Sequence, residues 1–519
     1  MIRVVCRVAA AGVLVVLAGC SGNGTGPTVR SGGTIYVSLP AAAASLNPLV
    51  ARDVASVRAY TPLFPLLYAA QADLSVGPSL ASAQPAYADG GKTLTVPLRT
   101  DAKWSDGTAI TADDVVYTVT TELNPHLQTQ AAFSWGPLTA VAKVDAHTVR
   151  FSLSAPDAAF VADALVTPIV PQHTLASVDP THMATDAYSS APKVTGGPFV
   201  FNHRDAANTI FLDANPSYFL GRPHADHLVE QVGDDAQAPT QLGEGKLSWD
   251  PQLSPASAGQ AIVSSGVAVS SYADTTLVAV QFNTRAGHPF ASPATRQALA
   301  YSTDHDALVG QATGGSQGIP EWGDINPTSW AAGGAMQYQL DLTHAAQLLH
   351  GAHPASSILF PSSDTQRASA AAIIAQQSVA AGFKLQPQGV SDAAFQAALS
   401  SGAFDAAVVS VSTGLDPDNS SLFATGGALN YGAYSNPALD ALVVSELNAT
   451  GAGASLQQAR KPIFAKIEQA VSGDLPFYFL WAPRHFMGFS ATLGGVTAVG
   501  VQLDADRTNS FYLDWFVAA

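Results

Sequence analysis

The pattern that most constrains the fold is an alternation of strand-like and helix-like segments between residues 275 and 412. Short apolar runs typical of strands lie at 275–284, 356–361, 384–390 and 404–412, with helical segments between them. Such an alternation predicts a mainly parallel sheet covered by helices. Ligands of these sheets bind beyond the carboxyl ends of the strands. We therefore predict an α/β fold with a binding site at such strand ends.

The first half of the chain also carries local signals. Residues 32–40 read as a strand, and residues 196–219 form two alternating runs around a polar turn, which predicts a hairpin. Thr111 precedes a helical segment whose first turn contains Asp113 and Asp114. A threonine at this position caps a helix, and acids in the first turn interact favourably with the helix dipole.

The N-terminus resembles a bacterial export signal. Two arginines precede an apolar run at residues 8–18, which is too short for an ordinary transmembrane helix and suits a signal peptide. Leu-Ala-Gly-Cys at 17–20 resembles a lipobox, in which the cysteine is acylated and becomes the first mature residue. We predict a signal peptide at 1–19, lipidation at Cys20 and a tether at 20–32 that holds the protein at the outer face of the cell membrane.

Charge and composition exclude some classes of protein. The formal net charge is −16, and the sequence has no cluster of basic residues to neutralise nucleic-acid phosphates. Hydrophobic residues make up 47% of the 519 positions, which is enough for a large core and several domains. We expect a folded protein outside the cytoplasm, without a nucleic-acid partner.

No motif of the sequence predicts catalysis or a metal site. Residues 314–318 match the serine-hydrolase pattern G-x-S-x-G around Ser316, but a helical segment precedes the match. The motif needs a strand before it and a helix after it, to expose the serine on a strained turn. His224 and His227 could contact one metal ion only if they lay on a helix, and the proline before them makes the segment turn-like. We expect no catalytic residue, no bound metal and no cofactor.

Several collinear segments resemble the peptide- and nickel-binding family of extracytoplasmic substrate-binding proteins of ABC transporters. The most specific is "DGGKTLTVPLRTDAKWSDGTAITADDVVYTV" at 89–119, which is similar to the signature segment of that family. Further matches include "GGPFVFNHRD" (196–205), "VQFNTRAGHPF" (280–290), "DPDN" (416–419) and "LPFYFLWAPRHF" (475–486). The resemblance runs from about residue 32 to near the C-terminus, and a lipobox is the usual anchor of Gram-positive members.

The resemblance implies a two-lobed, periplasmic-binding-protein-like α/β fold with an inserted third domain. In the family, ligand is enclosed between domains I and III as the lobes close about a hinge. The implied boundaries are domain I, which is discontinuous, at 33–50, 191–275 and 485–519, domain II as an insertion at 51–190, and domain III as the α/β lobe at 276–484.

The segment before "DPDN" bears on the ligand. In peptide-binding members an aspartate a few residues earlier pairs with the α-amino group of the peptide, and a buried carboxylate does this strongly. Aligned on the motif without a gap, this chain has Thr413 there, and Ser410 replaces the usual tryptophan. A threonine hydroxyl can hydrogen-bond an amine but cannot neutralise its charge. The departure weakens the expectation of a free peptide ligand and leaves the transport-receptor expectation intact.

Loops at the expected lobe junction supply further candidates for the cleft. Each is a polar or aromatic side chain after a predicted strand or in an irregular loop, where packing or turn formation is the alternative role. Exposed indoles suit stacking against rings or peptide planes. The complete set of cleft candidates is Ser45, Asn47, Trp322, Trp330, Thr413, Asp416, Asn430 and Tyr431.

We therefore expect a monomeric, lipid-anchored substrate-binding protein of an ABC importer. It would capture peptides or peptide-like solutes between two lobes and deliver them to permease subunits in the membrane. Two alternatives keep the same fold: a receptor for a sugar oligomer, a metal chelate or haem, and a regulatory lipoprotein that no longer transports. An exported hydrolase is the alternative from another class, and the missing nucleophile constellation argues against it.

Overall fold

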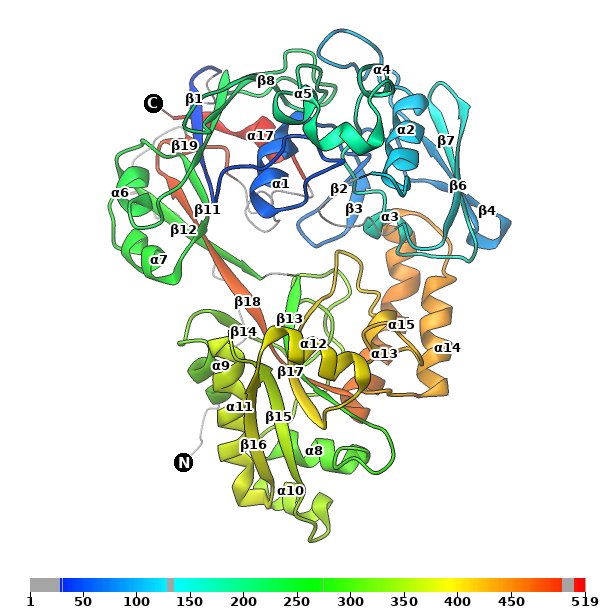
Figure 1. Cartoon of the computed structure of the whole chain (residues 1–519), viewed down its shortest axis with the longest axis vertical. Coiled ribbons are helices and arrows are strands. Elements are labelled where there is room, and N and C mark those ends of the chain that lie inside the picture. Colours follow the sequence, from blue (N-terminus) through cyan, green and yellow to red (C-terminus); the bar gives the residue numbers. More distant parts are fainter. Residues whose placement is uncertain (1–28, 30, 128–134, 274, 497–507, 519) are drawn as a thin grey trace, which may run out of the picture.

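The computed structural model describes residues 29, 31–127, 135–273, 275–496 and 508–518. Cys20, the predicted signal peptide and most of the predicted tether lie outside the described residues. Two lobes share one long strand, and a smaller unit packs beside the first lobe (Figure 1). Within the described ranges, no helix has the length and apolar character that a membrane span requires.

The first lobe is built on a mixed sheet. β1 pairs in parallel with β10, and β9 and β8 continue the sheet as an antiparallel hairpin, so the strand and the hairpin predicted from the sequence are both present. Its elements are β1 (Thr34–Leu39), α1 (Val54–Tyr60), η1 (Thr61–Leu63), α4 (Gln172–Leu175), η3 (Pro180–Thr185), α5 (Ala187–Ser190), β8 (Phe199–Arg204), β9 (Ile210–Ala214), β10 (His227–Val232), α6 (Ala238–Gly243), β11 (Trp249–Leu253), α7 (Pro255–Ile262), β12 (Val267–Ala273), β19 (Leu493–Gly494), α17 (Phe511–Asp514) and β20 (Phe516–Val517).

The small unit holds the segment that resembles the family signature. Its four-stranded sheet has the order β4-β5-β7-β6, and Trp104, which is 1% exposed, packs in its core. Its elements are β2 (Tyr68–Ala70), β3 (Val76–Pro78), β4 (Ala86–Ala88), η2 (Asp89–Gly91), β5 (Thr93–Pro97), α2 (Ala112–Glu122), β6 (Leu138–Asp145), β7 (Thr148–Leu153) and α3 (Phe160–Asp163).

Helix α2 begins with the cap that the sequence predicts. The Thr111 side chain accepts a hydrogen bond from the Asp113 amide, and the Asp114 carboxylate accepts one from the Thr111 amide at 2.8 Å. We expect Thr111→Ala to lower the free energy of unfolding by about 1 kcal/mol, because the helix loses its side-chain cap. Urea unfolding measures the loss. Thr120→Ala, on the exposed side of the same helix, is the control and should change it by less than about 0.5 kcal/mol. An equal effect of both changes would contradict the prediction.

The second lobe contains the alternating segment. β15, β16 and β17 are parallel, as the sequence predicts, but β13 lies antiparallel between β17 and β18, so the sheet is mixed. Its elements are β13 (Thr276–Phe282), α8 (Pro293–Tyr301), α9 (His305–Ala312), β14 (Gly318–Pro320), α10 (Leu342–Leu349), β15 (Ala355–Pro361), α11 (Thr365–Ser378), η4 (Val379–Ala381), β16 (Lys384–Val390), α12 (Asp392–Ser401), β17 (Ala406–Ser412), α13 (Ser420–Phe423), α14 (Pro437–Leu447) and α15 (Gly453–Asp474).

Strand β18 (Phe477–Ser490) belongs to both lobes. Its first part pairs with β13 and β14 of the second lobe, ending at the pair Gly318↔Pro483. Its second part pairs with β12 and β11 of the first lobe, beginning at Ala273↔Arg484. The change of partner between Pro483 and Arg484 marks the hinge segment, and Figure 1 shows β18 running from one lobe into the other.

The chain crosses between the lobes at two places among the described residues. One is the hinge segment of β18, and the other joins β12 to β13. The domain boundaries at 275/276 and 484/485 stay a prediction. The boundaries of the insertion at 50/51 and 190/191 stay a prediction. One continuous core includes Val50 and Tyr188 together with β1, whereas the separate core of the small unit runs from Leu67 to Ile169.

Candidate functional site

A cavity of about 640 Å³ lies where the two lobes face each other at the hinge segment. The first lobe contributes the end of β1, part of β11 and the start of α7, and the second lobe contributes two glutamines. The volume falls within the roughly 300–1,000 Å³ of typical ligand sites. The charged and amide side chains on its wall are Arg58, Asp235, Asp250, Gln252, Gln317, Gln366, Arg484 and His485.

Asp250 lines the cavity because of its place in β11. Its neighbour Trp249 packs into the core against Phe489 and Trp515, and successive side chains of a strand point to opposite faces. The Asp250 carboxylate accepts a hydrogen bond from the Gln252 amide at 2.9 Å, and the Gln252 side chain accepts one from Arg58 at 3.1 Å. Burial raises the pKa of Asp250, and this hydrogen bond, Ser38 and Arg58 offset part of the rise.

Asp235 places a second carboxylate on the first-lobe wall. It accepts hydrogen bonds from the Ser254 amide and the Ser257 hydroxyl, both at 2.8 Å, at the start of α7. Partial desolvation raises the pKa of Asp235, but these hydrogen bonds outweigh it and leave the pKa below its ordinary value. Asp235 is therefore ionised at neutral pH, and the first-lobe wall can pair with a positive group.

The second-lobe wall and the hinge segment present nitrogen donors. The Gln366 amide nitrogen donates to the Gln317 side-chain oxygen at 2.9 Å, and the Arg484 backbone N–H donates to the Gln317 carbonyl at 2.9 Å. The Arg484 guanidinium also lines the cavity. The first-lobe wall thus has two carboxylates beside Arg58, whereas the second lobe has neutral amides and the hinge segment has an arginine, and a solute with both positive and negative groups suits this set.

Ser45 and Asn47, two of the predicted cleft residues, lie inside the first lobe. The Ser45 hydroxyl donates to the Ser189 carbonyl at 2.9 Å. Asn47 is 0% exposed, donates to the Ser189 hydroxyl at 3.0 Å and accepts from the Leu49 amide at 3.0 Å. In this structure both side chains hold the loop after β1 against α5, away from the cavity.

Trp322, Asn430 and Tyr431 pack within the second lobe. Trp322 stacks on the His305 ring with centroids 3.8 Å apart. Asn430 donates to two backbone carbonyls and accepts from the Tyr434 amide, which closes the loop before α14. The Tyr431 carbonyl accepts from Arg285 at 2.9 Å. None of these three is among the residues that line the cavity.

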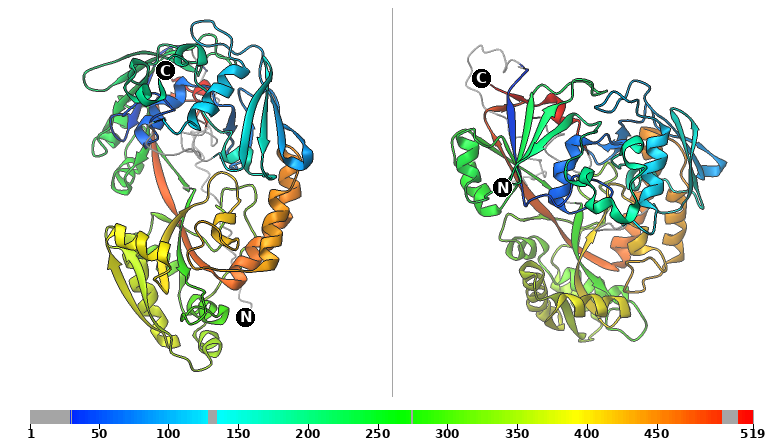
Figure 2. Two further views of the ribbon diagram at one scale, coloured as in Figure 1. Left: turned by 45° about the vertical axis from the view of Figure 1, so that its right-hand side comes forward. Right: turned by 45° about the horizontal axis from the view of Figure 1, so that its top comes forward.

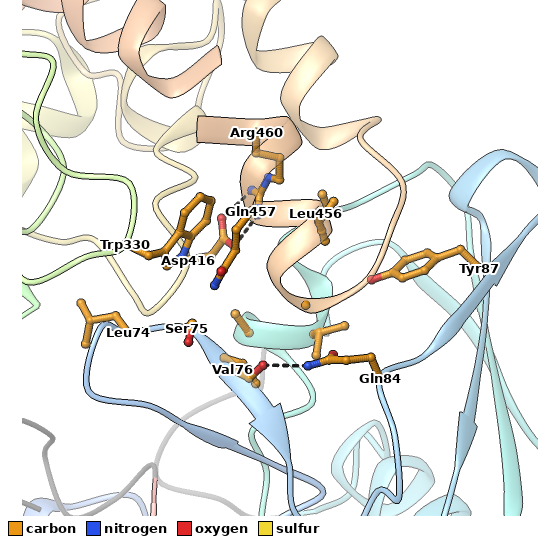
Figure 3. Close-up of a pocket in the computed structure, with 14 residues that line it drawn as sticks. Leu74, Ser75, Val76, Gln84, Tyr87, Trp330, Asp416, Leu456, Gln457 and Arg460 are labelled. Atoms are coloured by element: carbon orange, nitrogen blue, oxygen red, sulfur yellow. Dashed lines mark hydrogen bonds and ion pairs between the residues drawn. The ribbon is translucent and has the colours of Figure 1, made fainter. Parts of the chain in front are cut away.

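Thr413 lies beside the β12–β13 crossing, whereas Asp416 and Trp330 lie on the side of the second lobe that faces the small unit. The Thr413 hydroxyl donates to the Thr275 carbonyl at 2.6 Å, and Asp416 forms a bidentate ion pair with Arg460. Asp416 and Trp330 line a pocket of about 50 Å³ between α15 and the small unit (Figure 3). That volume holds a few waters at most, so the pocket is too small for a peptide.

Sequence reasoning missed the residues of the 640 Å³ cavity. They come from separate parts of the chain and form no motif, so only the fold brings Arg58, Asp250 and Arg484 to one place. One signal was present: the polar pair Arg484-His485 interrupts the apolar run of β18. A charged residue within an apolar strand indicates a position that does not face a core.

The structure also places the motifs considered for catalysis and metal binding. Ser316 is exposed in the loop between α9 and β14, so its match lacks the strand–turn–helix context. His224 lies in a loop and His227 begins β10, where it contacts Asp213. Among the described residues, no group of three or more His, Cys, Asp or Glu side chains is placed to hold a metal ion.

Comparison with known proteins agrees with this architecture. The family model "Bacterial extracellular solute-binding proteins, family 5 Middle" matches residues 75–432. The oligopeptide-binding protein AppA of Bacillus subtilis is 25% identical over 495 residues, which cover 90% of this chain and 89% of AppA. Protein XP55 of Streptomyces lividans is 28% identical over 485 residues, which cover 86% of this chain and 83% of XP55.

A solved structure shows the same fold. The structure of AppA from Bacillus subtilis in complex with a nonapeptide has a TM-score of 0.67 and 23% sequence identity, covering 95% of this chain and 100% of that chain. The matches extend over nearly the whole length of both proteins. The chain belongs to family 5 of the bacterial extracellular solute-binding proteins, the substrate-binding proteins of ABC transporters, which bind solutes and are not enzymes.

Proposed function

We propose that this protein captures peptides or peptide-like solutes between its two lobes and delivers them to a membrane permease. The observation that carries the proposal is the 640 Å³ cavity at the hinge segment, whose wall has carboxylates in one lobe and nitrogen donors at the hinge and in the other. A peptide has an ammonium group, which carboxylates bind, and it has a carboxylate and amide carbonyls, which nitrogen donors bind. The relative AppA is named an oligopeptide-binding protein.

Movement about the hinge segment would couple binding to delivery. Two crossings join the lobes within the described ranges, so rotation about them can widen or close the cavity without breaking either sheet. A solute that contacts both walls stabilises the closed arrangement, because it gains its full set of contacts only there. A permease that contacts both lobes can then distinguish the loaded from the empty protein.

Native mass spectrometry of the protein as purified tests the ligand class. We expect a bound mass that fits a peptide, and a mixed peptide pool should raise the melting temperature, because a ligand of the folded state stabilises it. The same thermal-shift screen includes oligosaccharides, nickel chelates and haem. A bound sugar or haem, with no shift from any peptide pool, would contradict the peptide proposal and leave the transporter family unchanged.

We also propose that Cys20 carries the lipid anchor. Cys20→Ala is expected to remove label from an alkyne-tagged fatty acid and to release most of the protein from the membrane fraction, because stable anchoring relies on the attached acyl chains. Labelling and immunoblots of membrane and medium fractions measure both effects. Cys6→Ala is the control, since Cys6 lies in the predicted signal peptide. Retained fatty-acid labelling in Cys20→Ala would disprove the assignment.

A further inference from the structure

Arg484 stands at the point where β18 changes partner. It is paired with Ala273 of β12 and directly follows Pro483, the last residue paired with β14. Its backbone N–H donates to the Gln317 carbonyl of the second lobe. The side chain lines the cavity between the lobes. Arg484 is therefore fixed by its backbone to both lobes, while its guanidinium faces the ligand space.

The Arg484 side chain is half-buried, and the described residues satisfy its guanidinium only in part. The guanidinium donates a long hydrogen bond of 3.5 Å to the Ser271 hydroxyl, and its Nε is buried without a partner in the described part of the chain. Two fully buried arginines have close partners instead: Arg460 contacts the carboxyl groups of Asp416 and Glu446, and Arg296 donates to three backbone carbonyls. An unsatisfied buried donor costs free energy, and more so when it is charged. This position therefore calls for an acceptor from outside the chain.

The surroundings of Arg484 favour a singly charged oxyanion. The Gln317 side-chain oxygen is occupied by Gln366, which leaves the Gln317 amide nitrogen to donate. Arginine and amide donors together suit a carboxylate, whose two oxygens accept in parallel. Asp235 and Asp250 on the same cavity disfavour a second negative charge, so a carboxylate fits better than a phosphate group.

We propose that Arg484 binds a carboxylate of the transported solute, assisted by the Gln317 amide. The inference rests on the proposed function and names one chemical group that the solute must carry. The solute carboxylate would then bind at the hinge segment of β18, about which the lobes move. Asp235 and Asp250 line the same cavity and are left for a positive group.

Two matched peptide pools test this assignment on the full mature protein. Random tetrapeptides with a free C-terminal carboxylate are compared with the same pool as C-terminal amides, by calorimetric titration. We expect wild type to bind the acid pool about 10- to 100-fold more tightly, the range expected for charge-assisted hydrogen bonds. Arg484→Gln should lose that preference, and Arg484→Lys should keep part of it. Arg150→Gln, at an exposed position of β7 in the small unit, is the control.

The outcomes separate the two proposals. Equal affinity of wild type for acids and amides would overturn the role of Arg484 and leave peptide capture in place. Binding of neither pool would overturn the peptide function and this inference with it. An acid preference that persists in a folded Arg484→Gln protein would place the carboxylate site elsewhere, and circular dichroism of the variant verifies that it is folded.

Discussion

Replacement of Arg460 by methionine is expected to destabilise the second lobe by about 3–5 kcal/mol, the usual cost of removing one partner from a buried ion pair. Arg460 is 2% exposed on α15, and its guanidinium donates to both oxygens of Asp416, at 2.7 and 2.6 Å. It also donates to Glu446 of α14 at 2.7 Å. One side chain thus joins two helices to the loop that follows β17.

Most of the lost stability is expected to come from the Asp416 carboxylate, which stays buried without its cation. Burial raises the pKa of Glu446 to about 9, and Arg460 offsets part of that effect, so Glu446 can take up a proton when it loses its donor. Burial by itself lowers the pKa of Arg460, but the two carboxyl groups outweigh it and raise that pKa. Methionine fills a similar volume and leaves Asp416, which is 6% exposed, with no cation beside it.

Urea unfolding followed by circular dichroism measures the change, and hydrogen exchange in α14 and α15 assigns it to the second lobe. Arg367→Met is the matched control. Arg367 pairs with Asp364 at 2.8 Å, but the two side chains are 17% and 34% exposed, so we expect a loss of at most about 1 kcal/mol. Similar losses of unfolding free energy for the two variants would mean that the buried ion pairs of Arg460 stabilise the protein no more than an exposed pair does.

Leu415→Asp is expected to separate the second lobe from the small unit and to weaken solute binding by about 10- to 100-fold. Leu415 is 3% exposed and packs against Ala70 and Leu74 of the small unit. Burying a leucine contributes about 1.5–3 kcal/mol, and a carboxylate at this position favours the separated arrangement instead.

Two backbone hydrogen bonds flank this contact. The Trp330 amide donates to the Asp73 carbonyl at 2.8 Å, and the Ala158 amide donates to the Leu447 carbonyl at 3.0 Å. Figure 2 shows α15 of the second lobe beside the small unit. The contact closes the molecule on the side away from the hinge segment, so its loss reduces the population of the binding-competent arrangement.

Small-angle scattering and peptide titration measure the effect of Leu415→Asp. The radius of gyration should rise, and far-ultraviolet circular dichroism should stay unchanged, because each lobe keeps its own core. Leu340→Asp is the control, since Leu340 is 51% exposed in the second lobe. An unchanged scattering curve with unchanged affinity would show that this contact does not influence lobe closure.

Local features of the fold were predictable from the sequence, and long-range pairing was not. The cap at Thr111 and the hairpin at 196–219 depend on neighbouring residues, so their patterns are visible in a short window. The apolar pattern of Thr276–Phe282 predicts a strand but not its direction in the sheet. Its antiparallel pairing with β17 and β18 depends on where those strands lie. The family resemblance predicted the lobes because it carries this long-range information.

The candidate site was predictable only in part, for the same reason. Thr413 and Asp416 follow a strand that ends near the lobe junction, but only Thr413 contacts the β12–β13 crossing, and Asp416 lies on the side that faces the small unit. Turn formation by Asp416 was visible in its neighbours, whereas its ion pair with Arg460 joins residues far apart in the chain. Asp250 and Arg484 lie in strands, where an apolar pattern predicts core, and only the assembled lobes reveal the cavity beside them.

The sharing of β18 between the lobes has a mechanical consequence. Hydrogen-bonded ladders hold the strand on both sides of the step from Pro483 to Arg484, so neither lobe can turn without twisting the backbone there. This short length of chain and the β12–β13 crossing must both twist whenever one lobe rotates against the other. We expect their stiffness to oppose large rotations of one lobe against the other. Replacing Pro483 by a residue with a more flexible backbone should therefore change the rate of solute release more than it changes which solutes the cavity binds.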